Sequence, residues 1–261
     1  MQRGFSLVEL SIVLVILGLL TGGILAGQSL IRAAELRSVT TEYGRWVTAM
    51  HSFRDKYMGI PGDMRDATRF WGHQTTTGWC SNTSGAAVSV NGTCDGNGNG
   101  TISLTAAANQ GGENFAFWRQ LALAGLIEGT YSGVAGPTNA EDSIIAVNIP
   151  SSKFSQAGWS SWGGDFPGDP YSFRYNYGIG FTYGAAGGQK AQGRIMKPEE
   201  AWNIDMKMDD GRPATGKVVA RFWNNECSIP NSGAASNTNY DASYNLGDSA
   251  IRCALHFPNL F

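Results

Sequence analysis

The chain opens with a long apolar stretch that contains a single acid. After a short leader that carries Arg3, the run FSLVELSIVLVILGLLTGGILAGQSLI has no charge except Glu9 before Arg32. A carboxylate in a membrane-spanning helix costs about 2.5–3.5 kcal/mol near the bilayer centre, and such a residue usually has a functional partner. As a helix, residues 5–26 extend ~33 Å, enough to cross the apolar core of a bilayer. The sequence therefore predicts a membrane-spanning helix and a partner for Glu9.

This N-terminus resembles that of the type IV pilin and pseudopilin family. Precursors in that family share a short basic leader, a glycine and then Phe-Ser/Thr-Leu-x-Glu, and residues 4–10 read GFSLVEL. The resemblance implies that a prepilin peptidase cuts between Gly4 and Phe5 on the cytoplasmic side and methylates the new α-amine of Phe5. Because the Glu9 carboxylate is poorly solvated in the membrane, we expect it to act in assembly by pairing with the positively charged Phe5 amine of an adjacent subunit.

A discarded secretory signal is the alternative interpretation of the same stretch. Leu25-Ala26-Gly27 imitates the cleavage site of such a signal, with the cut after Gly27. Leu25 fits poorly where a small residue is needed, and an acid such as Glu9 is unusual in the apolar region of a signal. We therefore expect only residues 1–4 to be removed, so that the apolar segment stays with the mature chain.

An amphipathic helical pattern continues beyond the apolar stretch. Apolar residues recur at steps of three and four and form one stripe: Leu36, Val39, Tyr43, Trp46, Met50, Phe53 and Tyr57. Charged residues, Glu42 among them, lie off this stripe, and the Gly-Ile-Pro-Gly-Asp run at 59–63 is a strong stop signal. The pattern predicts one helix over residues 5–57, membrane-spanning at about 5–26 and amphipathic at 27–57. We expect its apolar face to pack on the chain's own head, with a coiled coil as the alternative.

Residues 58–261 are expected to form a globular head of α+β class. Glycine is abundant, at 35 residues, and eight Trp and twelve Phe argue against disorder. Helical patterns occur at 63–71, 113–127 and 198–208, the second ending before Gly129, and β-type runs at 143–149, 171–177, 180–183 and 217–223. The sequence predicts a long helical spine followed by helices and mainly antiparallel strands, as in pilins.

The four cysteines fall into two pairs that are close in the sequence. The local pairing, Cys80–Cys94 and Cys227–Cys253, is the simplest of three possible connectivities. Disulfides require an oxidising compartment, which agrees with export of the head. A zinc site is the alternative, although no Cys-x-x-Cys or His-x-x-x-His spacing supports it.

A run of oxygen-bearing residues resembles the first half of an EF-hand loop. Asp95, Asn97 and Asn99 alternate with glycines, and the backbone carbonyl of Thr101 follows in the pattern. Position twelve is an alanine, so we expect Glu113, at the start of the next helix, to supply the missing carboxylate. Calcium loops ahead of such a helix occur among pseudopilins, and the resemblance implies Ca²⁺ here. The alternative is an Asn-Gly-rich turn that binds nothing.

Other patterns give weaker signals. A second acidic cluster, Asp205, Asp209 and Asp210, is read as a solvated turn rather than a cation site. The three histidines are scattered, no Gly-x-Ser-x-Gly elbow is present, and the glycine-rich run at 184–190 lacks a phosphate-loop ending. The aromatic residues Trp159, Trp162, Phe166 and Tyr171 are expected to pack in the core; a carbohydrate-binding surface is the alternative.

The leading hypothesis is a structural subunit of a type IV pilus or a type II secretion-like pseudopilus, and not an enzyme. The resemblance implies other pilin subunits, a prepilin peptidase and an inner-membrane assembly platform as partners, with the lipid bilayer surrounding the helix before assembly. It places the precursor in the bacterial inner membrane with its head in the periplasm, and later in a filament. A net charge of −2 argues against a general nucleic-acid binder. The alternatives are an adhesin displayed on a pilin-like anchor and a membrane-anchored hydrolase.

Overall fold

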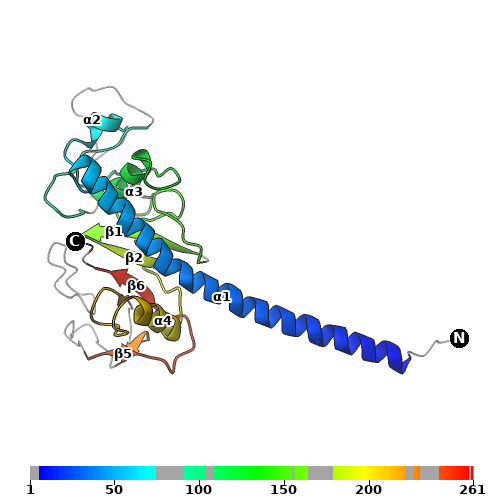
Figure 1. Ribbon diagram of the computed structural model, residues 1–261. Coiled ribbons are helices and arrows are strands. Elements are labelled where there is room, and N and C mark those ends of the chain that lie inside the picture. Colours follow the sequence, from blue (N-terminus) through cyan, green and yellow to red (C-terminus); the bar gives the residue numbers. More distant parts are fainter. Residues whose placement is uncertain are drawn as a thin grey trace.

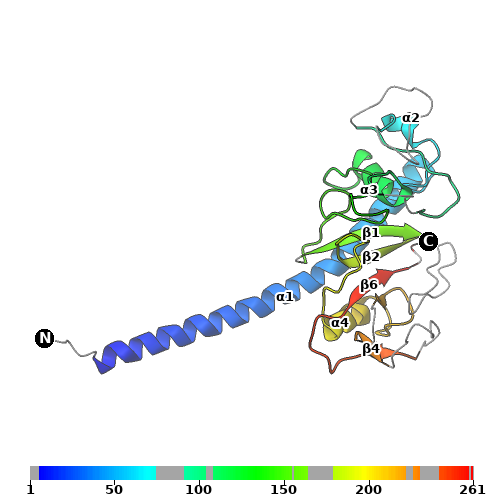
Figure 2. The same ribbon diagram turned by 180° about the vertical axis from the view of Figure 1, so that it is seen from behind.

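A computed structural model of the chain describes residues 6–74, 91–103, 108–154, 156–163, 179–221, 226–229, 241–258 and 260. Its dominant element is α1, Leu7–Tyr57, a single helix of 51 residues. The first half of α1 projects away from the rest of the molecule, and the second half lies across the head (Figures 1 and 2). The long apolar N-terminal helix and the mixed head confirm the predicted α+β class.

Both ends of α1 follow from local sequence. Ser6 is the N-cap residue and forms a capping box with Glu9. At the other end Met58 adopts the left-handed conformation, with φ 54°, and its backbone N–H donates to the Arg54 carbonyl over 2.8 Å. The predicted stop signal at residues 59–63 therefore acts immediately after the last helical residue, Tyr57.

The two halves of α1 have different surroundings. The large apolar side chains from Leu7 to Ile31 are all exposed. In the second half, one face is buried: Val39, Glu42, Trp46, Ala49, Met50 and Phe53. This face packs on the chain's own head, as expected, rather than on a partner helix. Glu42 is the exception to the prediction, because this charged residue lies inside the buried face.

The head is built on a small antiparallel sheet in the order β1-β2-β6-β3. These strands are β1 (Ala157–Gly163), β2 (Ile179–Ala185), β6 (Ala254–Phe257) and β3 (Val219–Arg221). A second, two-stranded sheet pairs β4, Ser228–Ile229, with β5, Ser243–Tyr244. The chain terminus thus returns to the centre of the main sheet through β6.

Aromatic side chains join α1 to the sheet. The Tyr43 ring stacks on Phe257 of β6 with centroids 4.7 Å apart. Trp46 meets Trp118 edge to face at 5.4 Å, and Trp118 stacks on Phe181 of β2, also at 5.4 Å. Such pairs contribute about 0.5–1.5 kcal/mol each beyond the area that they bury. The core of the head is therefore an aromatic layer between α1 and the sheet.

Three further helices cover the ends of this layer. Helix α2, Ala67–Trp71, and helix α3, Glu113–Leu123, lie near the C-terminal end of α1, whereas α4, Pro198–Met208, lies nearer the projecting half (Figure 1). The prediction for 198–208 is confirmed at both ends. The helix predicted at 113–127 ends earlier, at Leu123, because Gly125 takes a positive φ of 73° two residues later.

The strand predictions were partly wrong. Residues 143–149 form turns, because Ala146 has a positive φ of 63° and the buried Asn148 side chain accepts from the Ile144 N–H over 2.6 Å. The run predicted at 180–183 lies inside the longer strand β2, and the run predicted at 217–223 contains β3. The run predicted at 171–177 lies outside the described residues. Strand β1 was missed, because its sequence AGWSSWG does not alternate between apolar and polar residues.

Glu42 ties α1 to the edge of the sheet. One carboxylate oxygen accepts the backbone N–H of Lys153 over 2.8 Å, and the other accepts the indole N–H of Trp159 over 2.8 Å. The buried indole N–H of Trp159 requires an acceptor, because an unpaired buried polar group costs about 1–3 kcal/mol, and the Lys153 N–H is partly buried. Glu42 is thus part of the contact between α1 and the head, although the apolar stripe predicted that it lies off the buried face.

We predict that Glu42→Ala destabilises the head by about 2–5 kcal/mol, because it leaves two donors without an acceptor. Glu42→Gln keeps an oxygen and should cost less. The measurement is denaturant unfolding of the fragment from residue 30 onward, followed by tryptophan fluorescence. Glu35→Ala is the matched control, since it removes only a partly exposed ion pair with Arg32, worth about 0–1 kcal/mol. Equal costs for Glu42→Ala and Glu35→Ala would contradict this role of Glu42.

Candidate functional site

The apolar helix begins at a capping box that includes Glu9, the acid of the apolar stretch. The Glu9 carboxylate accepts the backbone N–H of Ser6 over 2.9 Å, and the Ser6 hydroxyl accepts the N–H of Val8 over 3.3 Å. An acid in the first turn is also stabilised by the helix dipole. Glu9 therefore has an intrasubunit partner. Gly4 and Phe5, the predicted cleavage and methylation residues, lie outside the described residues.

A second anchor fixes α1 to α4 where the apolar half ends. Arg32 donates two hydrogen bonds to Glu200: its Nε lies 2.5 Å from Oε1 of Glu200, and its Nη2 lies 2.7 Å from Oε2. Its guanidinium also lies 4.1 Å from the centroid of the Phe154 ring. The hydrogen bond with Glu200 raises the pKa of Arg32. The first charged residue after the apolar stretch is thus held by the head.

The predicted calcium residues organise a short loop. The Asp95 carboxylate accepts the N–H and the hydroxyl of Thr68, over 2.7 and 2.8 Å, and so caps the first turn of α2. The Asn97 side-chain oxygen accepts the N–H of Asn99 over 2.9 Å. The Asn99 oxygen in turn accepts the N–H of Thr101 over 3.0 Å. These side chains therefore shape the turn through local hydrogen bonds.

Glu113 reaches this loop, as predicted, together with a carboxylate that the sequence analysis missed. Glu113 accepts the backbone N–H groups of Asn97 at 2.8 Å and Ser103 at 2.7 Å. Asp63 accepts those of Asn99 at 3.1 Å and Gly100 at 2.8 Å. Both acids are buried. Asp63 ends the stop signal at residues 59–63 and begins the helix predicted at 63–71, which starts only at Ala67 in the structure, and neither pattern predicts a ligand at Asp63.

Backbone packing beneath the loop requires glycine at position 62. Gly62 has a φ of +85°, and a Cβ there would lie 2.3 Å from the Glu113 carbonyl oxygen. Its N–H donates to the Gln120 side chain over 2.7 Å. Close approach of this segment to α3 is what brings Asp63 and Glu113 to the same loop.

The donor set is compatible with a cation without requiring one. Burial raises the pKa of the Glu113 carboxyl, although two backbone N–H groups oppose that shift. Each carboxylate oxygen has a second lone pair, so accepting one N–H does not prevent coordination. Calcium binding by Asp95, Asn97, Asn99, Thr101 and Glu113 stays a prediction.

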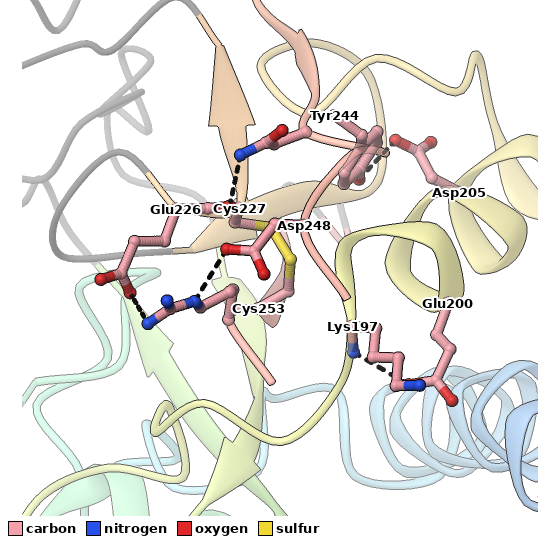
Figure 3. Close-up of a disulfide and its surroundings, with 10 residues drawn as sticks. Lys197, Glu200, Asp205, Glu226, Cys227, Tyr244, Asp248 and Cys253 are labelled. Carbon is pink, nitrogen blue, oxygen red and sulfur yellow. Dashed lines mark hydrogen bonds and ion pairs between the residues drawn. A yellow bond between two sulfur atoms is a disulfide. The ribbon is translucent and has the colours of Figure 1, made fainter. Parts of the chain in front are cut away.

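The acidic residues after α4 form a compact turn. Asp205, Asp209 and Asp210 are the one group of acidic, histidine or cysteine side chains in the described residues close enough to share a metal ion. Asp205 is fully buried and accepts the Tyr244 hydroxyl over 2.8 Å and the Gly211 N–H over 3.2 Å (Figure 3). Burial, together with the two neighbouring aspartates, raises the pKa of Asp205 to about 7.

The other two acids of this turn bind its backbone. Asp209 accepts the N–H of Lys217, and Asp210 accepts the N–H of Arg212 over 2.8 Å. The Asp210 carboxylate also accepts the Thr215 hydroxyl over 2.6 Å. These contacts support the expected turn.

One predicted disulfide is confirmed. Cys227 and Cys253 are bonded, with their Cα atoms 5.2 Å apart, and join the segment before β4 to the segment before β6 (Figure 3). The Arg252 side chain beside this bridge pairs with Asp248 at 2.9 Å and with Glu226 at 2.9 Å. Cys94 is also disulfide-bonded. Cys80 lies outside the described residues, so the Cys80–Cys94 pairing stays a prediction.

The remaining candidate groups are structural where they are described. Trp159 and Trp162 are buried and belong to the core rather than to a binding surface. Phe166 and Tyr171 lie outside the described residues. His256 is also buried, and burial, with Arg221 and Lys190 nearby, lowers its pKa well below the ordinary value. His256 is thus kept neutral inside the sheet.

We predict that Asp205 makes the head less stable as pH rises from about 4 to about 7. The folded-state pKa lies above the unfolded value of about 3.9, so the folded state holds a proton that the unfolded state releases. Asp205→Asn should flatten this dependence and gain stability relative to wild type at pH 8. The measurement is the free energy of unfolding against pH, with Asp55→Asn as control. Parallel curves for Asp205→Asn and wild type would contradict the assignment.

Comparison with known proteins bears on the N-terminus. Residues 1–25 match a family model described as the prokaryotic N-terminal methylation motif. No curated protein and no solved structure gives a significant match to the chain. Among the described residues, α1 is the one helix long and apolar enough to cross a membrane. The chain therefore carries the N-terminal signal of type IV pilins and pseudopilins, on a long apolar helix that fits a type IV pilin-like protein.

Proposed function

We propose that the chain is a structural subunit of a type IV pilus or a type II secretion-like pseudopilus. The observation that carries the proposal is the methylation motif at residues 1–25, which is continuous with the exposed apolar half of α1. An exposed apolar helix of this length needs a cover, because burial of one large apolar side chain is worth about 1.5–3 kcal/mol. Lipid covers it in the precursor, and the helices of other subunits cover it in the filament.

In this proposal the precursor is inserted in the bacterial inner membrane with residues 1–4 inside and the head in the periplasm. A prepilin peptidase removes the leader and methylates Phe5, and an inner-membrane assembly platform transfers the subunit into the filament. Only the four leader residues are lost, so α1 remains intact. Rigid attachment of α1 to the head, through Glu42 and through Arg32 with Glu200, supports this role, because the position of the helix then fixes the position of the head.

The other two functional classes have less support. An adhesin displayed on a pilin-like anchor needs an exposed recognition surface, and Trp159 and Trp162 are buried. A hydrolase needs a nucleophile and a base in contact, and His256 is buried and neutral. The structural role accounts for the motif, the apolar helix and the acid at position 9 together.

The first prediction concerns processing of the N-terminus. Gly4→Glu should leave an uncut precursor that accumulates in the membrane, because the peptidase requires the small residue before the scissile bond. Mass spectrometry of the wild-type protein should find N-methylated Phe5 as the first residue. Ser6→Ala, which keeps Gly4, should still be cut and serves as the control. A mature N-terminus at Gln28 would overturn the proposal.

The second prediction concerns Glu9. In the membrane its carboxylate is held by the Ser6 N–H, and in the filament we propose that it pairs with the charged amine of Phe5 on an adjacent subunit. Opposite charges about 4 Å apart attract by about 4 kcal/mol at an effective dielectric constant of 20. Methylation does not remove the charge, because a secondary amine is protonated at neutral pH. Glu9→Gln should therefore be cut and inserted normally but incorporated poorly.

The Glu9 test compares the amount of each variant in membranes with its amount in sheared filaments. Glu9→Gln retains an oxygen for the capping box, so it separates the loss of charge from the loss of the helix cap. Glu9→Ala removes both and should be at least as defective. Normal incorporation of Glu9→Gln would show that the charge does not guide assembly.

We also propose that Ca²⁺ stabilises the loop at residues 95–103 together with Glu113. A ligand that binds only the folded state adds about 2.7 kcal/mol at a hundred times its Kd. Calcium should therefore raise the melting temperature of the wild-type head, and a chelator should reverse the effect. Asn97→Ala should lose this response. It is a cleaner variant than Asp95→Ala, which also removes the α2 cap. Identical melting of the wild type with calcium and with chelator would refute the site.

A further inference from the structure

A groove of about 490 Å³ follows one flank of α1 where the helix leaves its apolar half. The end of the groove nearer the N-terminus of α1 is apolar and is lined by Leu30, Ala33 and Ala34. The other end is basic and is lined by Arg37, Arg45 and Lys153. All six are exposed. The groove is therefore amphipathic along the direction of the helix, with its apolar end toward the projecting half.

The groove lies on the side of α1 that the central strands leave uncovered. Consecutive residues on a helix point about 100° apart. Glu42 binds the Lys153 backbone and Trp159 of β1, whereas its neighbour Tyr43 stacks on Phe257 of β6. β1 is an edge strand of the sheet. The flank beyond Glu42 therefore faces outward, past the edge of the sheet.

The cations of the groove form no ion pair with any described residue, although Arg45 lies 4.7 Å from the centroid of the Trp46 ring and shares an adjoining pocket with Glu128. Arg37, Arg45 and Lys153 take part in none of the ion pairs that the described residues form, in contrast to Arg32, which pairs with Glu35 and Glu200. The carboxylate that lines the groove is Glu42, and both of its oxygens accept internal hydrogen bonds. The groove thus presents a net positive charge.

The position of the groove matches the headgroup layer of a bilayer. The exposed apolar run of α1 continues five residues past the span predicted at about 5–26 and ends at Ile31, and we take Ile31 as the limit of the apolar core. Arg37 follows Ile31 by six residues, or about 9 Å of helix. Side chains on a helix lean toward its N-terminus, so the Arg37 guanidinium lies closer to the membrane than its Cα. The headgroup region adds about 5–7 Å on each side of the apolar core. Arg37 is therefore within reach of lipid phosphates.

We propose that this groove binds one anionic phospholipid while the subunit is in the membrane. The acyl chain lies along Leu30 and the alanines, and the phosphate is bound by Arg37. Lys153 and Arg45, the latter about 12 Å further along α1, continue the positive surface of the groove beyond it. The proposal rests on the membrane-embedded precursor of the proposed function. It assigns a ligand to a surface that subunit assembly alone leaves unexplained.

The test uses the full chain in nanodiscs of phosphatidylcholine mixed with phosphatidylglycerol. The protein is extracted in mild detergent, and the phosphatidylglycerol that copurifies is measured by mass spectrometry. Wild type should be enriched in phosphatidylglycerol over the starting mixture. Arg37→Gln combined with Arg45→Gln and Lys153→Gln should reduce this enrichment at least fivefold, because one basic residue near an anionic surface contributes about fivefold in partitioning.

The matched control removes three cations from the far end of α1 and from α2: Arg54→Gln, Lys56→Gln and Arg69→Gln. It should keep the wild-type enrichment, and the single variant Arg37→Lys should keep most of it because the charge remains. Unchanged enrichment in the groove variant, or an equal loss in the control, would overturn the proposal. So would Ala33→Cys disulfide dimers in pure phosphatidylcholine, which would assign the groove to a second copy. Failure of the proposed function shows separately, as absent cleavage between Gly4 and Phe5.

Discussion

The structure depends on the contact between the second half of α1 and the aromatic layer of the head. Val39, Trp46, Met50 and Phe53 supply the apolar side of that contact, and the sheet supplies Phe181 and Phe257. Because one continuous helix crosses from the projecting half into this contact, its direction is set by the head. Most helical stability in proteins comes from packing of one face, so this contact also stabilises the second half of α1.

Two carboxylates on α1 show how one residue type meets two different needs. Glu9 lies in the apolar half, where one of its oxygens accepts the Ser6 N–H and no other donor among the described residues. Glu42 lies in the packed half, where both oxygens are satisfied by the head. Among the described residues, one Glu9 oxygen has no donor, whereas each Glu42 oxygen accepts a donor from the head. This difference supports an assembly role for the first and a structural role for the second.

The sequence predicted the elements that local signals control. The length of α1 followed from the apolar run, the stripe from Leu36 to Tyr57 and the stop signal, and α4 followed from Pro198 with its acidic first turn. Long-range contacts were not predictable in this way. Glu42 is buried because Lys153 and Trp159 lie opposite it, and residues 143–149 turn because Asn148 binds their backbone. Nothing in the local pattern indicates those partners.

The same distinction applies to the candidate sites. The motif at residues 4–10 was readable because identity and spacing are both local. The role of Asp63 in the loop was not predictable from the sequence, because Asp63 reaches the loop only where Gly62 packs closely on α3. The amphipathic groove depends both on the local sequence of α1 and on a long-range contact with the head. Its basic residues Arg37 and Arg45 are visible in the sequence, but Lys153 joins them only because Glu42 holds its backbone against α1. The hydrogen bond that joins Glu42 to the Lys153 backbone therefore also completes the positive surface of the groove.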